Sequence, residues 1–177
     1  EETLAGFKGQ DDSVVYASGY LGNTILLEAL VGKYTTVFAD SAAHSSIRSA
    51  LNCSGSEYYF YEHLDHAHLD FLLSSHPSAA PVVMTDGFFA LTGEIAPLDR
   101  IYPVARKHNA RLIIDDAHST GILGKTGKGT PEYFGLPADG SVLQTETMSK
   151  AIGSYGGFIS CSHELAEIGR ASCRERV

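Results

Sequence analysis

The chain has 177 residues, of which 44% are hydrophobic and 19% charged, a balance typical of one globular domain. Its formal net charge of −8 argues against an extended surface for DNA, RNA or anionic membranes, because such surfaces need clustered Lys and Arg. No apolar run approaches the roughly 20 residues that cross a bilayer, and the acidic start EETLAGF does not resemble a secretory signal. We therefore expect a cytoplasmic protein without a membrane segment.

Short runs rich in Val, Ile and Phe alternate along the chain with helix-like segments. This alternation is typical of repeated βα units around a mostly parallel sheet. We expect an α/β fold in three layers, α/β/α, with a mostly parallel seven-stranded sheet. The predicted strands, in chain order, span residues 13–17, 35–39, 57–61, 81–85, 111–115, 141–145 and 157–161.

Four segments between these strands have the apolar spacing of helices. The first, residues 23–32, begins with Asn and ends with Gly, which together mark a complete helix. Pro103 lies in the last segment, where it would kink or start a helix. The predicted helices span residues 23–32, 44–52, 67–75 and 98–108.

The chain shows no internal repeat or linker, and we treat residues 1–166 as part of one domain. Residues 167–177, EIGRASCRERV, read as the in-frame translation of a sequencing adapter joined to a truncated gene. The alternative is a genuine Arg-rich helix end. The missing initiator Met and the abrupt basic tail favour a fragment of a longer protein.

Chemically distinctive residues follow four of the predicted strands, where ligands of open α/β sheets collect. After the first strand comes SGYLGN, in which the backbone N–H groups of Gly19 and Tyr20, next to Ser18, are suited to hold an anion at a helix start. No GKS or GKT follows, so this is not a Walker P-loop. Taken alone, this segment is more simply interpreted as a plain turn between strand and helix.

The motif IIDDAHSTG places Asp115 at the end of a buried strand and His118 three residues later. A buried carboxylate needs a partner, and a protonated ring nitrogen is one candidate. The alternative is a turn capped by Asp116 with His118 at the surface. No third ligand is spaced to complete a metal site, so we expect none.

The motif SKAIGSYGG surrounds Lys150 with small residues and apolar runs. A nucleophilic lysine must lose part of its hydration, and small neighbours let a cofactor approach it closely. A lysine in a flexible glycine loop is the alternative when Lys150 is considered alone. The fourth strand end is DSAAH, with His44, after the strand at residues 35–39. Together, the four strand ends combine an anion site, a carboxylate, imidazoles and a lysine.

Five motifs in this order carry a family resemblance: SGYLGN, DSAAHSSI, TDGFFALTGEIAPL, IIDDAHSTGILGKTGKG and TMSKAIGSYGG. The chain resembles the fold-type I pyridoxal-phosphate enzymes, and within them the α-oxoamine synthases. This family includes 8-amino-7-oxononanoate synthase, glycine C-acetyltransferase and serine palmitoyltransferase. The resemblance implies that residues 1–166 are part of the cofactor-binding large domain.

The resemblance also implies the residues that bind pyridoxal phosphate. Lys150 is expected to bond covalently to the cofactor, and Asp115 to pair with the pyridine nitrogen and keep it protonated. His118 is expected to hydrogen-bond the phenolic oxygen, and His44 to stack on the ring. The expected phosphate ligands are Ser18, Gly19, Tyr20 and Thr147.

The activity implied by the resemblance is the condensation of an amino acid with an acyl-CoA, usually with decarboxylation, to an α-aminoketone. Lys150 would also act as the general base. A homodimer is expected for the full-length protein, and the fragment alone is expected to be inactive. Two alternatives remain: an aminotransferase or decarboxylase of the same fold, and a non-catalytic subunit of a synthase heterodimer. The presence of Lys150 argues against the second.

The chain departs from the family pattern at two places. Ala90 stands where the family often has a serine, and the frequent HND motif appears as His63, Leu64 and Asp65. Both changes weaken assignment to a particular member of the family. They leave the expected cofactor chemistry intact.

Overall fold

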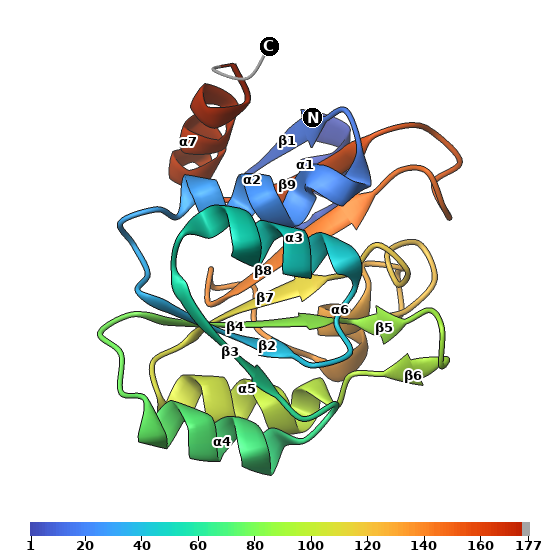
Figure 1. Ribbon diagram of the computed structural model, residues 1–177. Helices are drawn as coiled ribbons and strands as arrows, with labels where there is room; N and C mark the ends of the chain where they lie inside the picture. The colour runs from blue at the N-terminus through green and yellow to red at the C-terminus, as the bar shows by residue number, and fades with distance from the viewer. Residues whose placement is uncertain (175–177) are drawn as a thin grey trace.

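A computed structural model describes residues 1–174 of the protein and the side chains of residues 1–171. Seven strands form its main sheet, and Figure 1 shows the helices lying on both sides of it. The strands are β1 (Asp12–Tyr16), β2 (Thr36–Asp40), β3 (Glu57–Tyr61), β4 (Pro81–Asp86), β7 (Arg111–Asp115), β8 (Val142–Thr147) and β9 (Gly157–Cys161).

The strand order in this sheet is β1-β9-β8-β7-β4-β2-β3. Strand β9 runs antiparallel to β1 and β8, whereas the remaining neighbours pair in parallel. The predicted α/β fold with a mostly parallel seven-stranded sheet is therefore confirmed. Each predicted strand begins and ends within two residues of the corresponding observed strand.

Two groups of helices cover the two faces of the sheet. Helices α2, α3 and α7 pack on one face around Leu26 and Ile47, and α4 and α5 pack on the other around Leu69 and Ile101. The α-helices are α1 (Glu2–Lys8), α2 (Gly22–Ala29), α3 (Ser45–Ser54), α4 (His66–Ser75), α5 (Leu98–Lys107), α6 (Thr130–Phe134) and α7 (His163–Arg174).

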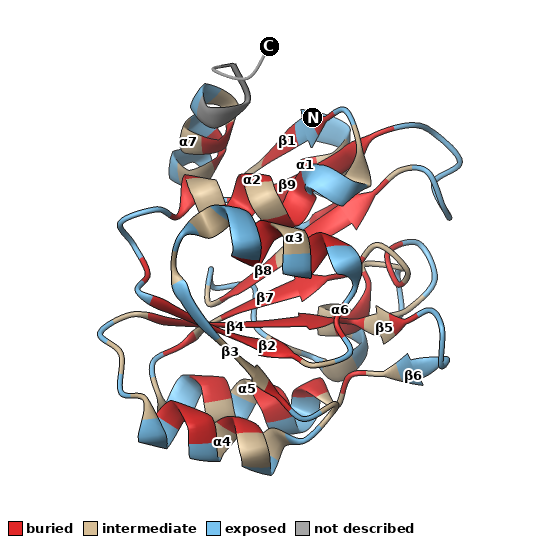
Figure 2. Ribbon diagram, viewed as in Figure 1, coloured by how far each residue is buried: buried red, intermediate tan, exposed pale blue. Residues whose placement is uncertain are grey.

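The central strands are buried on both faces, as Figure 2 shows in red. Every residue of β2 and β4 is buried. This explains why their sequences are nearly continuous apolar runs instead of alternating polar and apolar residues. Buried Asp40 and Asp86 end these two strands, so the apolar pattern changes at the edge where ligands collect.

The structure adds elements that the sequence patterns did not predict. These are α1, α6, α7, a one-turn 3-10 helix, and a short hairpin of β5 (Phe88–Phe89) and β6 (Glu94–Ile95). Pro103 lies inside α5 and does not start it, because the helix begins at Leu98. Within the described residues, no helix is long and apolar enough to span a membrane.

Helix α7 crosses the predicted boundary at residue 166. Its Arg170 lies 2.8 Å from Asp12 Oδ1 and 3.1 Å from Glu1 Oε2, so it joins α7 to the N-terminal part of the chain. The interpretation of residues 167–177 as an adapter translation remains a prediction, and residues 175–177 lie outside the described part.

Candidate active site

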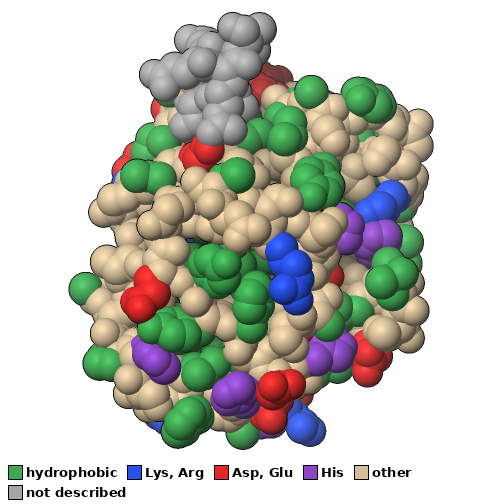
Figure 3. Space-filling model, in the orientation of Figure 1, with side chains coloured by type: hydrophobic (Ala, Val, Ile, Leu, Met, Phe, Trp, Pro, Cys, Tyr) green, Lys and Arg blue, Asp and Glu red, His purple; other side chains and the backbone are tan. Residues whose placement is uncertain are grey.

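The carboxyl ends of β1, β2, β4, β7 and β8 lie at one edge of the sheet, because β1 and β8 both run antiparallel to β9. In Figure 1 the arrowheads of β4 and β7 point to the right. Figure 3 shows histidine and basic side chains together on that side of the molecule. This edge, called here the carboxyl edge, contains the predicted site residues.

Lys150 and His118 form the most direct contact of the site. Lys150 Nζ lies 2.8 Å from His118 Nε2. Burial, followed by the charge of Lys150, lowers the pKa of His118. The neutral imidazole is therefore favoured, and its Nε2 accepts a hydrogen bond from the lysine. Burial also lowers the pKa of Lys150, although the charges of Asp115 and Asp86 oppose this shift.

Asp115 ends β7 and is held by donors from other elements. Its Oδ2 accepts hydrogen bonds from Asn23 Nδ2 at 2.7 Å and from Ser46 Oγ at 3.2 Å, and its Oδ1 accepts one from the Ala117 amide at 3.2 Å. Asn23 in turn accepts a bond from Thr145 Oγ1 at 3.0 Å. These bonds fix the carboxylate's orientation at the edge of the sheet.

Asn23 and Ser46 are therefore part of the site, although sequence reasoning assigned them only to helices. Both are buried, and Asn23 Nδ2 also donates to Ser46 Oγ at 3.0 Å. Asn23 lies inside α2 and directs its amide to Asp115. A buried polar residue in the first turn of an otherwise apolar helix was the available signal.

His44 precedes α3 and caps its first turn. Its Nδ1 accepts a hydrogen bond from the Ser46 amide at 3.2 Å and lies 2.7 Å from Ser46 Oγ. Its backbone N–H donates to Asp86 Oδ2 at 3.0 Å, and its ring meets that of Tyr20 edge-on, with centroids 6.0 Å apart. The imidazole is thus held from both its ring and its backbone.

Asp86 is a site residue that sequence reasoning missed. Its side chain is buried, and its Oδ1 has no hydrogen-bond partner among the described residues. Burial raises the pKa of Asp86 to about 8, and the charge of the neighbouring Asp115 adds to this shift. The signal was present, because Asp86 directly follows the apolar run of β4, as Asp115 follows that of β7.

The turn after β1 lies directly against the end of β8. A Cβ added at Gly19 would come within 2.6 Å of Thr147 Oγ1, so only glycine allows this approach. Ser18 Oγ accepts a hydrogen bond from the Tyr20 amide, and Thr147 Oγ1 lies 2.8 Å from Ser149 Oγ. Hydroxyl groups and backbone amides therefore gather at one point, as an anion site requires.

A cavity of about 120 Å³ opens between His44 and His118. Its wall includes Asp86 and the Ala90 that replaces the family's serine. His63 also lines it, with Nδ1 2.8 Å from Asp40 Oδ1. The cavity is thus mainly apolar, with three imidazoles and one buried carboxyl group at its wall.

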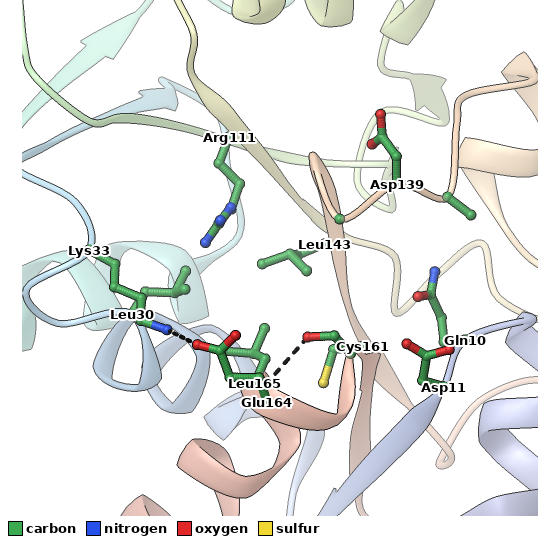
Figure 4. A pocket seen from close by; sticks show the side chains of 13 residues that line it. Gln10, Asp11, Leu30, Lys33, Arg111, Asp139, Leu143, Cys161, Glu164 and Leu165 are labelled. Atoms are coloured by element: carbon green, nitrogen blue, oxygen red, sulfur yellow. Dashed lines mark hydrogen bonds and ion pairs between the residues drawn. The ribbon is translucent and has the colours of Figure 1, made fainter.

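A larger cavity, of about 460 Å³, lies at the opposite, amino edge of the parallel strands (Figure 4). Lys33 and Glu164 form an exposed ion pair of 2.9 Å there, and Arg111 projects from the start of β7. None of the predicted site residues lines this cavity. Its size therefore does not identify it as the site of the predicted chemistry.

The structure brings all eight predicted residues to the carboxyl edge. They form connected groups through the contacts given above: Lys150 with His118, His44 with Tyr20, and Gly19 with Thr147. Within residues 1–174, no cluster of three or more His, Cys, Asp or Glu side chains is arranged to hold a metal ion. The predicted residues are Ser18, Gly19, Tyr20, His44, Asp115, His118, Thr147 and Lys150.

Comparison with known proteins gives consistent matches. The chain is 38% identical over its full length to a putative 8-amino-7-oxononanoate synthase of Acetivibrio thermocellus, and covers 45% of that protein. It is 39% identical over 95% of its length to the 8-amino-7-oxononanoate synthase of Geobacter sulfurreducens, and covers 43% of it. The chain thus spans less than half the length of these curated relatives.

Solved structures show the same likeness. A serine palmitoyltransferase from S. paucimobilis with bound PLP-myriocin aldimine superposes with a TM-score of 0.91 and 32% identity, covering all of this chain and 44% of that one. An 8-amino-7-oxononanoate synthase from Francisella tularensis gives 0.85 and 25%, covering 99% and 50%. The family model described as aminotransferase class I and II matches residues 1–172. The chain therefore belongs to the aminotransferase class I and II family.

Proposed function

We propose that this chain is the cofactor-binding part of a pyridoxal-phosphate-dependent α-oxoamine synthase, which condenses an amino acid with an acyl-CoA. The observation that carries the proposal is the contact of 2.8 Å between Lys150 Nζ and His118 Nε2, beside a fixed Asp115 carboxylate. A nucleophilic amine, an imidazole and a carboxylate are the three groups that this chemistry requires.

The residues present fit pyridoxal phosphate. Gly19 approaches Thr147 so closely that an added Cβ would fill the space between them, which supports a phosphate position at this turn. Asp115 would hold the pyridine nitrogen, His118 the phenolic oxygen and Lys150 the aldehyde carbon. His44 would stack on the ring, and Ser18 and Tyr20 would complete the phosphate site.

The cofactor would supply an electron sink for the charge that develops at the amino acid's Cα. Asp115 would stabilise the positive ring nitrogen, because its carboxylate is held by Asn23 and Ser46 and needs little reorganisation. Lys150 would remove the Cα proton, and its lowered pKa increases the share of the free amine that this role needs. His118 would hydrogen-bond the phenolic oxygen once its contact with Lys150 is released.

The names of the relatives favour an acyltransferase over the aminotransferase alternative. The similar proteins described above are 8-amino-7-oxononanoate synthases and a serine palmitoyltransferase. The two imidazoles of His44 and His118 fit the same branch of the family. We propose an amino acid and an acyl-CoA as substrates, and we assign neither the amino acid nor the acyl group.

A cytoplasmic homodimer is the form we propose for the complete enzyme. Large apolar side chains are exposed on the loops around the site, including Leu91, Ile122 and Tyr155. Such exposed groups mark surfaces that another chain covers. The second copy would then help to exclude water from Lys150, and the fragment alone would be inactive.

Product analysis tests the proposed reaction. A full-length protein that carries these residues is incubated with pyridoxal phosphate, amino acids and acyl-CoA thioesters of increasing chain length. Release of free CoA together with an α-aminoketone is the expected result. Formation of a keto acid from the amino acid without CoA release would instead identify an aminotransferase.

A further inference from the structure

A buried ion pair lies beneath the segment that carries His118. Lys8, at the end of α1, places its Nζ 2.7 Å from Glu146 Oε1 on β8, and neither side chain is more than 1% exposed. Burying both charges removes them from water, so an apolar pair of similar volume is often at least as stable. The buried ion pair is therefore weak evidence for a stabilising role, and we looked for another role in its contacts.

Lys8 also contacts the segment between β7 and α6. Its Nζ donates hydrogen bonds to Thr120 Oγ1 at 3.3 Å and to the carbonyl oxygen of Lys128. These two residues lie on either side of a glycine-rich turn, 121–127, which has little side-chain packing of its own. One buried ammonium group thus joins the first helix, strand β8 and two points of this segment.

Asp116 fixes the two ends of the same segment. Its carboxylate accepts hydrogen bonds from the Thr130 amide at 3.0 Å, from Thr130 Oγ1 at 2.6 Å and from Gln144 Nε2 at 2.8 Å. Its own amide donates to the Thr145 carbonyl at 2.9 Å. Residues 116 and 130 are therefore held together and to β8, and His118 lies between them.

Two buried carboxyl groups lie near one ammonium group in this cluster. Lys8 is paired directly with Glu146, its charge also acts on Asp116, and Glu146 Oε2 has no hydrogen-bond partner among the described residues. Burial raises the pKa of Glu146 to about 7 and also raises that of Asp116, while Lys8 opposes both shifts. Loss of Lys8 would leave two buried carboxyl groups without a cation.

We propose that Lys8 is a positioning residue, which together with Glu146 and Asp116 holds segment 116–130 so that His118 stays in contact with Lys150. His118 Nε2 is 2.8 Å from Lys150 Nζ, and its neighbour Thr120 is bonded directly to Lys8. This role rests on the proposed function, because it matters only if His118 and Lys150 act together.

The first test separates positioning from stability. The double variant Lys8→Met and Glu146→Leu replaces the ion pair with apolar side chains and is compared with Lys33→Met, which removes the exposed pair at the amino edge. The chain is studied without cofactor. The pKa of His118 is measured by NMR, and the reactivity of Lys150 is measured by reductive methylation and peptide mass spectrometry.

We expect the double variant to lose little stability, because the charge of Glu146 is removed together with that of Lys8 and Asp116 keeps its hydrogen bonds from Thr130 and Gln144. The pKa of His118 is expected to rise toward the ordinary value of about 6.5. Lys150 is expected to be methylated several-fold more slowly, because a more hydrated lysine is more fully protonated. The Lys33 variant leaves both values unchanged. A stable double variant with unchanged His118 and Lys150 would show that the ion pair has only a structural role.

A milder pair of variants decides the matter if the double variant does not fold. Thr120→Val removes one acceptor of Lys8, and Thr126→Val removes an exposed hydroxyl of the same segment that donates to Glu132. We expect Thr120→Val alone to shift the pKa of His118. If the pKa of His118 is the same in both variants and in the wild type, the proposal is overturned. Because no cofactor is present, this result is independent of the reaction that the enzyme catalyses.

Discussion

The two edges of the sheet differ in how they hold polar side chains. At the carboxyl edge, Asp115 is buried and accepts hydrogen bonds from three other residues. At the amino edge, the cavity is nearly four times larger, but its Lys33 and Glu164 form an ion pair exposed to solvent. Fixed, partly desolvated groups are able to stabilise developing charge, whereas exposed ones are screened by water.

The size of a cavity is therefore a poor guide to the position of the reacting groups. The smaller cavity is lined by His118, which contacts Lys150, and by Asp86, whose pKa is raised to about 8. Perturbed titratable groups cluster at functional sites because catalysis needs them. Variants matched across the two edges test whether the distinction holds.

The largest effect is expected from Asp115→Asn. The amide keeps the shape of the side chain but loses the charge that would stabilise a protonated pyridine nitrogen. In the full-length enzyme with pyridoxal phosphate, exchange of the amino acid's α-hydrogen should slow by about 100-fold or more. Asp139→Asn, at the amino edge, is the control and should leave the rate unchanged. Equal rates in all three proteins would contradict the proposed role of Asp115.

Gly19→Ala tests the close approach at the predicted phosphate site. Its new Cβ would lie 2.6 Å from Thr147 Oγ1, so the turn or the strand end must shift. Crowding of this kind typically costs about 1–3 kcal/mol, and affinity for pyridoxal phosphate should fall.

Gly6→Ala provides the control for this substitution. Gly6 lies in α1 with nothing within 4 Å of its added Cβ, so alanine should stabilise the helix by about 0.5–1 kcal/mol. Both effects are read from denaturant unfolding, and cofactor affinity from absorbance titration. Unchanged affinity in Gly19→Ala would place the phosphate elsewhere.

Asp86→Asn tests whether burial at the carboxyl edge raises a carboxyl pKa. The folded pKa of about 8 exceeds the ordinary value of 3.8, so the folded state binds a proton that the unfolded state releases. The resulting stabilisation is complete below about pH 4 and is lost as the pH rises toward 8. At pH 8 the amide variant should therefore be more stable than the wild type by on the order of a few kcal/mol.

Asp139→Asn gives the opposite sign at the amino edge. Hydrogen bonds from Ser141 lower the pKa of Asp139, so its contribution is present at neutral pH and is lost as the pH falls. Its exposure keeps this contribution small. Unfolding curves between pH 4 and 8 compare the two variants. A wild-type pH slope retained in Asp86→Asn would contradict the buried-acid assignment.

The smallest effects are expected from two left-handed backbone positions, one near each edge. Leu64 has a φ of 58° and Asn109 has a φ of 54°. A left-handed conformation costs most residues about 1–2 kcal/mol, and asparagine tolerates it. Asn109→Leu should therefore destabilise the protein by about 1 kcal/mol. Leu64→Asn should stabilise it by less than that, because the half-buried leucine also packs against the core.

Thermal unfolding with a far-UV probe measures both changes. Leu64 replaces the asparagine of the family's frequent HND motif, so the reverse substitution restores a residue suited to this backbone. A loss of stability in Leu64→Asn would mean that the leucine's packing outweighs its backbone strain.

The strands and the family were predictable from the sequence because both depend on contiguous residues. Strands such as β7 are apolar runs that end in a carboxylate, and a motif such as SKAIGSYGG is read directly. The short hairpin of β5 and β6 was missed, because strands of two residues have no measurable period.

The supporting residues of the site could not be found in this way. Asn23 and Ser46 reach Asp115 across 92 and 69 residues of sequence, and Lys8 reaches Glu146 from the opposite end of the chain. Only the fold brings such groups together. Asp86 is different, since its position after an apolar strand was a sufficient signal that went unused.

Covalent trapping of the cofactor tests the central claim most directly. The chain is incubated with pyridoxal phosphate, reduced with borohydride and digested, and the labelled peptides are identified by mass spectrometry. The proposal predicts a label on Lys150, at the carboxyl edge, and its loss in Lys150→Ala. A label mainly on Lys33 at the amino edge, or one of equal yield in Lys150→Ala, would contradict it.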